Sequence, residues 1–241
     1  TIRNKILSAI VAFTALMWVV SYIMSRWSIG EPVKILTDLG LTITSFGGVI
    51  IAIFSGIVLV WNEVDRKTIL PLLAKPVSRG EYLVGKFIGF SCAVQVVYIG
   101  MSIVFLIFLW ASGRTPSASL IAAIVFTMGE IEILIAWAVF FSTLTNPTLS
   151  AIFMIIIFIV GRLSEDLNRF LSTQEQSLNI LILKGIYWVI PHLSLFNLRP
   201  YATYELAIEG RFIIIGFLYS LSYTLLLLFL AWKVFRERDL A

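Results

Sequence analysis

The chain has 241 residues, of which 59% are apolar and 13% are charged, and its formal net charge is +4. With a mean hydropathy of +0.97, this composition lies far outside the range of soluble globular proteins and predicts an integral membrane protein. The excess of basic residues is explained by membrane topology. Because no basic face is interleaved with aromatic residues, nucleic acid is excluded as a partner.

Six apolar stretches approach the roughly 20 residues that a helix needs to cross a hydrocarbon core of about 30 Å. They are residues 6–25, 40–61, 84–110, 118–143, 147–164 and 211–232. Barrel strands would instead alternate in segments of about ten residues. The predicted fold class is therefore all-α: a polytopic membrane protein with six transmembrane helices in one domain, residues 1–241.

The first stretch follows two basic residues and has no small-residue cleavage site after it, so we interpret it as a retained anchor. The chain begins with Thr1 rather than Met, which suggests a trimmed start and leaves open whether an amphipathic helix precedes it. Short loops on the side of the N-terminus hold Arg3, Lys5, Arg66, Lys67, Lys75, Arg79, Lys86, Lys233, Arg236 and Arg238, whereas the opposite short loops hold Arg26, Lys34 and Arg114. The positive-inside rule then predicts an inner (plasma) membrane protein with both termini in the cytoplasm.

The second stretch has small residues at every fourth position: Gly48, Ala52 and Gly56. This spacing lets the backbones of two helices approach closely in a membrane. It predicts a packing contact, either within the bundle or between two copies of the chain.

The loop of residues 63–86 is long and rich in charge, and its pattern predicts a short helix. Thr68 is suited to cap the helix, and Pro71 falls in the first turn, where its missing N–H is harmless. Leu70, Leu72 and Leu73 supply an apolar surface, and Pro76 ends the helix. We expect this helix to lie across the cytoplasmic surface of the membrane.

A second helix is predicted to begin near Arg79 and to continue into the third apolar stretch, because Ser78 and Glu81 have the spacing of a capping box. Gly80, Gly85 and Lys86 also fit the glycine and lysine positions of a phosphate-binding loop. Such a loop requires a preceding strand and a Ser or Thr after the lysine, and neither is present. ATP hydrolysis is therefore expected on another chain.

Other catalytic and metal-binding patterns are weak. Cys92 is the single cysteine and His192 the single histidine, so a cysteine metal cluster is excluded and a histidine site has no partner ligands. No nucleophile with a neighbouring base is apparent. We predict a non-catalytic subunit with no cofactor and no metal of its own.

Two carboxylates, Glu130 and Glu132, lie well inside the fourth apolar stretch. Intramembrane carboxylates are costly and are candidates for a functional site. Their spacing turns them about 200° apart on a regular helix, so they cannot both face one pathway. The alternatives are a helix broken near Gly129 with the carboxylates in a wet vestibule or paired with Lys or Arg, and a proton or cation site.

The outer segment of residues 164–210 contains an apolar stretch, residues 178–190, that is too short to cross a membrane. With Tyr187 and Trp188 near its end, it predicts one or two short helices in the outer interface. These helices would cap an exit route or contact an accessory protein outside the membrane.

The loop motifs resemble those of one transporter family. Glu63-Val-Asp-Arg-Lys-Thr-Ile, Leu72-Leu-Ala-Lys-Pro-Val-Ser-Arg and Glu81-Tyr-Leu-Val-Gly-Lys are similar to the first cytoplasmic loop of type-2 ABC transporter permeases. Asn146-Pro147 between two spans and Pro191-His-Leu-Ser-Leu-Phe-Asn outside extend the likeness, which is strongest to the permease group named for multicopper-enzyme maturation. Pro71 is a departure from the usual loop sequence.

The resemblance implies a six-span permease that pairs with a second permease, identical or related, and with two cytoplasmic ATPase subunits that bind ATP and magnesium. It also implies a coupling helix from Thr68 to Lys75. The residues expected to contact the ATPase are Arg66, Lys67, Thr68, Ile69, Leu70, Leu72, Leu73, Lys75 and Arg79. A helix lying only on lipid is the alternative for this segment.

The function predicted from these features is that of the permease in an ATP-driven exporter. Two alternatives are a membrane subunit that transmits force to an outer partner without moving cargo, and a secondary carrier that uses Glu130 or Glu132.

Overall fold

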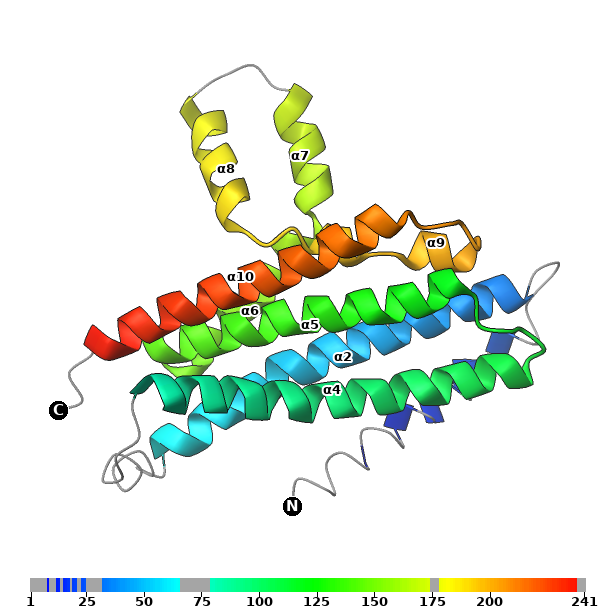
Figure 1. Ribbon diagram of the computed structural model, residues 1–241, viewed down its shortest axis with the longest axis horizontal. Helices are drawn as coiled ribbons and strands as arrows, with labels where there is room; N and C mark the ends of the chain where they lie inside the picture. Colours follow the sequence, from blue (N-terminus) through cyan, green and yellow to red (C-terminus); the bar gives the residue numbers. More distant parts are fainter. Residues whose placement is uncertain are drawn as a thin grey trace.

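The computed structural model describes residues 8, 12–13, 15–17, 19–20, 23–24, 32–65, 79–173 and 178–237. Five helices form an elongated bundle in the last three of these ranges (Figure 1): α2 (Pro32–Asp65), α4 (Arg79–Ala111), α5 (Ala118–Leu144), α6 (Pro147–Arg162) and α10 (Gly210–Glu237). Short helices connect α6 with α10, namely α7 (Ser164–Thr173), α8 (Leu178–Val189), the 3-10 helix η1 (Leu193–Phe196) and α9 (Arg199–Thr203). No described residue belongs to a strand, which confirms the all-α class for this part of the chain.

Helices occupy all the predicted spans that the structure describes. Four helices in the described part are long and apolar enough to cross a membrane, and the bent pair of α6 and α7 makes a fifth if it is counted as one span. The stretch of residues 6–25 lies mostly outside the described residues. Its described residues are helical, and Phe13 and Met17 are buried in the core. A six-span topology therefore stays a prediction.

The helix boundaries agree best where the sequence has an explicit start signal. α4 begins at Arg79, as predicted from the capping spacing. Asn146 caps α6, since its side chain accepts a hydrogen bond from the N–H of Leu149, and Pro147 is the first residue of that helix. α2 begins at Pro32, well before the predicted residue 40, because hydropathy marks the apolar part of a helix rather than its end.

Helix α5 is the central element of the bundle. It contacts α2, α4, α6, α9 and α10, and residues 133–139 are buried without interruption. A run of consecutive buried residues covers every face of a helix, which requires neighbours on all sides. The other described helices each expose apolar side chains outward, as expected for surfaces that meet lipid.

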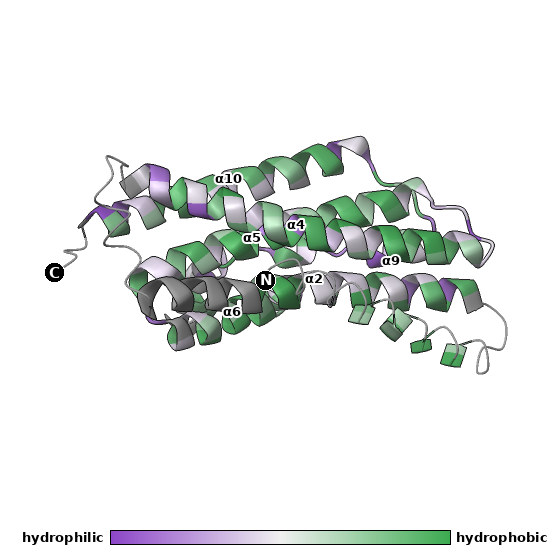
Figure 2. Ribbon diagram, turned by 90° about the horizontal axis from the view of Figure 1, so that it is seen from below, coloured by the Kyte–Doolittle hydropathy of each residue, from purple (hydrophilic) through white to green (hydrophobic). Residues whose placement is uncertain are grey.

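The two ends of the bundle differ in their elements. At one end, which we call the α9 end, α9 lies beside the start of α2 and the connection between α4 and α5 (Figure 1). At the other end, the C-terminal end, α2 and α10 finish and α4 begins. Hydrophobic residues predominate along the long helices, and hydrophilic residues gather toward their ends (Figure 2).

Helix α6 is shorter than a membrane span. Its 16 residues extend only about 24 Å at 1.5 Å per residue, less than the hydrocarbon thickness of about 30 Å. α6 alone is therefore shorter than the predicted span of residues 147–164, which stays a prediction. The chain bends by 59° at the end of α6, and α7 and α8 leave the side of the bundle as a helical hairpin (Figure 1).

Candidate functional site

The two intramembrane glutamates of α5 face different neighbours, as their spacing requires. The side chain of Glu130 is completely buried, and its Oε2 forms an ion pair of 3.0 Å with Nη2 of Arg162, the last residue of α6. The Oε1 atom of Glu130 and the Nη1 atom of Arg162 have no hydrogen-bond partner among the described residues. A buried carboxylate without a cation would be very unfavourable, so Arg162 is what allows Glu130 to occupy the core.

A second arginine lies close to this pair. Arg199, on α9, donates hydrogen bonds to Thr42 Oγ1 on α2 at 2.6 Å and to Asn197 Oδ1 at 3.2 Å. Burial lowers the pKa of the Arg199 guanidinium, and the positive charge of Arg162 lowers it further. The site thus brings together polar groups of α2, α5, α6 and α9, of which Glu130 is fully buried and the others are partly buried.

Helix α5 is unbroken at Gly129, so the predicted break there is wrong. A Cβ atom at this position would lie 3.0 Å from Phe196 Cε1 and 3.2 Å from Ser220 Oγ. The Ser220 hydroxyl of α10 donates to the Gly129 carbonyl at 3.0 Å. The glycine therefore permits close approach of α10 and η1 rather than a bend, because the hydrogen bond needs the two backbones near each other.

Glu132 faces α4. Its Oε1 accepts hydrogen bonds from Ser91 Oγ at 2.5 Å and from Gln95 Nε2 at 3.0 Å, and Gln95 also donates to the carbonyl of Met128. Glu132 is partly exposed, whereas Glu130 is fully buried. The structure places the two glutamates in separate polar clusters and does not bring them together.

The small residues of α2 lie inside the bundle where they are described. A Cβ atom on Gly48 would lie 2.7 Å from both Ile131 Cδ1 of α5 and Tyr98 Cδ2 of α4, and Ala52 is completely buried. At Gly56 the structure describes the helical backbone only. Gly48 thus meets α4 and α5 of its own chain.

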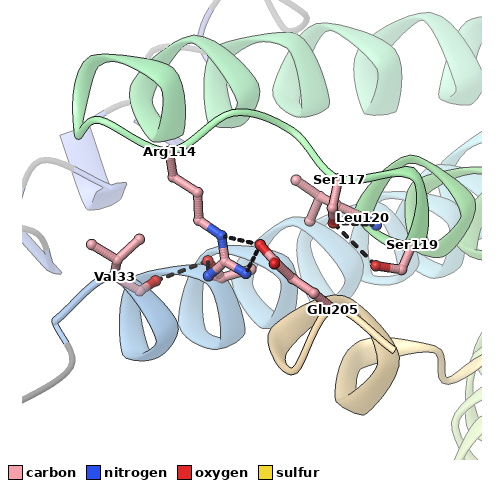
Figure 3. A network of polar contacts seen from close by, with 7 residues as sticks. Val33, Arg114, Ser117, Ser119, Leu120 and Glu205 are labelled. Atoms are coloured by element: carbon pink, nitrogen blue, oxygen red, sulfur yellow. Dashed lines mark hydrogen bonds and ion pairs between the residues drawn. The ribbon is translucent and has the colours of Figure 1, made fainter. Parts of the chain in front are cut away.

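An ion pair links three elements at the α9 end. Arg114, between α4 and α5, contacts Glu205, which follows α9, with Nη2 and Oε1 2.7 Å apart (Figure 3). Arg114 Nη1 also donates to Thr37 Oγ1 on α2 at 3.0 Å. Glu205 has a left-handed backbone, with φ of 54°, which is unfavourable for a residue with a Cβ atom. The ion pair therefore holds a strained turn in place.

The two ends of the α7–α8 hairpin, which we call its feet, are residues 161–164 and 189–194. They contact the bundle and each other. A Cβ atom on Gly161 would lie 2.8 Å from the carbonyl oxygen of Pro191, and the hydroxyls of Ser164 and Ser194 lie 2.8 Å apart. The N–H of His192 donates to Tyr219 Oη on α10 at 2.9 Å. Burial lowers the pKa of the His192 imidazole, because an apolar environment disfavours its charged form.

Metal ligands do not gather in the described part of the chain, where no group of three or more His, Cys, Asp and Glu residues could hold an ion. Cys92 is exposed on α4. The expectation of a chain without a metal or cofactor stays a prediction.

The predicted coupling segment lies almost wholly outside the described residues. This applies to Arg66, Lys67, Thr68, Ile69, Leu70, Leu72, Leu73 and Lys75, while Arg79 is described in its backbone only. The helices that flank this segment, α2 and α4, end and begin at the C-terminal end of the bundle (Figure 1).

Sequence reasoning missed the partners of the two glutamates. Arg162 stands at the end of an apolar stretch and Arg199 stands in a loop, so both resembled ordinary boundary charges. One signal for Arg162 was available. The apolar stretch before it is too short to cross the membrane, so its charge was expected to lie inside the membrane and to need a partner.

Comparison with known families gives one match that covers almost the whole chain. A family model described as "ABC-2 family transporter protein" matches residues 2–240. Comparison with the curated proteins finds no match.

Proposed function

The chain belongs to the ABC-2 family of transporter proteins, and from this membership we propose that it is the permease subunit of an ATP-driven exporter. It is a multi-pass membrane protein of an ABC transporter. Cargo would cross between two permease chains, and ATP and magnesium would be bound by a separate cytoplasmic ATPase. The family match over residues 2–240 is the single observation that carries the proposal. The likeness of the loop motifs to the multicopper-enzyme maturation group is a finer part of it.

The coupling step is proposed for residues 66–78, between α2 and α4. An ATPase that closes on nucleotide can move a membrane bundle only through a rigid element joined to the spans. Helices α2 and α4 both reach the C-terminal end of the bundle, where Lys86, Lys233 and Arg236 also lie. These basic residues support a cytoplasmic location for that end, which would place both chain termini and the coupling helix in the cytoplasm.

The partners follow from this arrangement. Two ATPase subunits and a second permease would complete the transporter, since each permease presents one coupling helix. Leu70, Leu72 and Leu73 would fill an apolar groove of the ATPase, and the basic residues beside them would form the polar rim, a division typical of protein interfaces.

The test replaces Leu72 and Leu73 with Asp and measures recovery of the ATPase when the permease is purified from membranes in mild detergent. Two buried charges in an apolar interface should release most of the ATPase. The matched control is Leu206→Asp, which introduces a charge at an exposed leucine of the α9 end and should leave ATPase recovery unchanged. Full ATPase recovery and activity with the Leu72 and Leu73 variant would overturn the coupling proposal.

A second candidate function is force transmission to an outer partner. The observation that favours it is the long connection between α6 and α10, residues 163–209, which is far longer than a simple turn between two helices needs. Deleting residues 165–188 separates the two functions. A force-transmitting subunit should lose the stimulation of ATPase activity by its outer partner. An exporter should lose cargo movement, measured in vesicles that contain no such partner.

A secondary carrier is the weakest of the three functions. Glu130 is paired with Arg162, which leaves Glu132 as the better candidate of the two glutamates for a carrier site. If Glu132→Gln leaves transport unchanged at every pH, the carrier function is wrong.

A further inference from the structure

The hairpin of α7 and α8 leaves the bundle from its middle. Its first foot includes Arg162, which pairs with Glu130 near the middle of α5. Its second foot is held by α10, where Tyr223 Oη donates to the carbonyl of Val189 at 2.8 Å and Tyr219 Oη accepts from His192. Figure 1 shows both feet near the middle of α10, with the hairpin pointing away from the bundle axis.

The charged ends of α10 set the depth of these feet in the membrane. Arg211 and Lys233 flank the apolar part of this helix. At 1.5 Å per residue, Tyr219 lies about 12 Å from Arg211 and Tyr223 about 15 Å from Lys233. In a hydrocarbon core of about 30 Å, the feet of the hairpin are close to mid-depth.

The two helices of the hairpin have opposite surfaces. On α8, Leu181, Trp188 and Val189 are exposed, and lipid can cover them. On α7, Glu165, Asp166 and Arg169 are exposed, and Glu165 and Arg169 form an ion pair of 2.6 Å. Charged side chains at the membrane centre are energetically unfavourable unless protein or water surrounds them.

Tilting of α7 does not remove this cost. Glu165 and Asp166 are in the first turn, directly after the foot, so their depth is fixed by the Glu130–Arg162 pair. Their side chains are too short to reach an interface about 12 Å away. Lipid is therefore an unsuitable neighbour for the exposed face of α7, and this face requires protein or water.

We propose that the exposed face of α7 packs against α7 of a second copy of this chain, across a two-fold axis that also bounds a water-lined space. The charge order of α7 is self-complementary, because its first turn is acidic and Arg169 lies in the next turn. Two antiparallel copies place Asp166 of each chain opposite Arg169 of the other, as an isologous contact requires. The inference rests on the proposed function, which includes a second permease, and assigns that partner as an identical chain.

Cysteine cross-linking tests this contact directly, because Cys92 is the single native cysteine and Cys92→Ser gives a cysteine-free chain. In the antiparallel pair Asp166 of one chain lies opposite Arg169 of the other, so co-expressed Asp166→Cys and Arg169→Cys chains in membranes should form a disulfide-linked dimer of the 27.1 kDa chain on mild oxidation. The matched control is Val96→Cys, exposed near the middle of α4 on the edge of the bundle away from the hairpin, and it should form several-fold less dimer.

Charge reversal tests the register. The readout is co-purification of two differently tagged cysteine-free chains in mild detergent: Asp166→Arg in both chains should reduce recovery of the second chain several-fold, and Asp166→Arg combined with Arg169→Asp should restore it. A membrane-impermeant maleimide should label Asn168→Cys when it is reduced, and should leave Val96→Cys unlabelled.

Three results would overturn the inference: cross-linking of Arg169→Cys to a different polypeptide, monomer only after oxidation of the co-expressed Asp166→Cys and Arg169→Cys chains, or no labelling of Asn168→Cys by the maleimide. ATPase recovery is measured on the same samples. If the ATPase is retained while the dimer is absent, the α7 contact is wrong and the permease function stands. If the ATPase is absent from all samples, including the cysteine-free chain, the permease function itself is contradicted.

Discussion

Glu130 and Arg162 form an ion pair in the interior of the bundle, with one partner on the central helix and the other on the last residue of α6. The pair joins the helix that is surrounded on all sides to the point where the chain bends into the hairpin. It is therefore the first place where substitutions should separate structural from functional roles.

Removing one partner of this pair should be strongly destabilising. Glu130→Leu leaves the guanidinium of Arg162 buried without its carboxylate and should lower the free energy of unfolding by about 3 kcal/mol or more. The double variant Glu130→Leu and Arg162→Leu removes both charges and should recover much of the loss. Unfolding by a denaturing detergent, followed by tryptophan fluorescence, measures both values. Equal stability of the single variant and the wild type would contradict the role assigned to the pair.

Glu132 should tolerate an amide better than an apolar residue. Glu132→Gln keeps an oxygen that accepts from Ser91 and Gln95, whereas Glu132→Leu leaves both donors unsatisfied at a cost of about 1–3 kcal/mol. The same unfolding measurement ranks the two variants. The reverse order would mean that the carboxylate is not held by these two donors.

The turn at Glu205 offers a test of backbone strain. Glu205→Ala and Glu205→Gly both remove the ion pair with Arg114, but only glycine adopts a φ of 54° without cost. The glycine variant should be more stable than the alanine variant by about 1 kcal/mol. Melting temperatures of the purified chains in one detergent check this difference.

Close packing of α2 should make Gly48 intolerant of even one methyl group. Gly48→Ala forces Ile131 and Tyr98 to move and should cost about 1–3 kcal/mol. Gly89→Ala on α4 is the control, because no atom lies within 4 Å of the added carbon, and this change should be neutral or slightly stabilising. Similar stability of the two variants would show that α2 does not approach its neighbours as described.

The stability of the chain should fall in mild acid through His192. Because burial lowers the pKa of this imidazole, the unfolded chain binds a proton at a higher pH than the folded chain does. The contribution of His192 is complete above its ordinary pKa of about 6.5 and is lost as the pH falls through the lowered value. The melting temperature of wild type should drop more between pH 7 and pH 5 than that of His192→Gln. Parallel curves for the two chains would contradict the burial of this side chain.

Much of the helical architecture was predictable, because apolar length and capping residues are local signals. α4 starts at Arg79 and α6 at Pro147, where the sequence carries a capping pattern and an Asn-Pro pair. The bend after Arg162 was not predicted, since hydropathy marks only where the apolar stretch ends, at residue 164, and does not show the direction that the chain takes after it.

The candidate site was predictable only in part. The sequence singles out Glu130 and Glu132 because carboxylates are rare in apolar helices. Their partners are set by the tertiary fold: Arg162 is 32 residues from Glu130 along the chain, and Ser91 is 41 residues from Glu132. Gly129 was interpreted as a break, whereas its role is to admit α10, which only the packed structure reveals.

The enclosure of α5 predicts how unevenly the chain should tolerate change over evolutionary time. Residues on α10 such as Ile214, Phe217 and Leu225 face outward. Lipid chains adapt to apolar side chains of any shape, so one apolar residue can replace another there. Residues 133–139 of α5 meet only other side chains of the protein, so each is restricted in volume. Random mutagenesis should leave α10 permissive to apolar exchange and α5 nearly invariant.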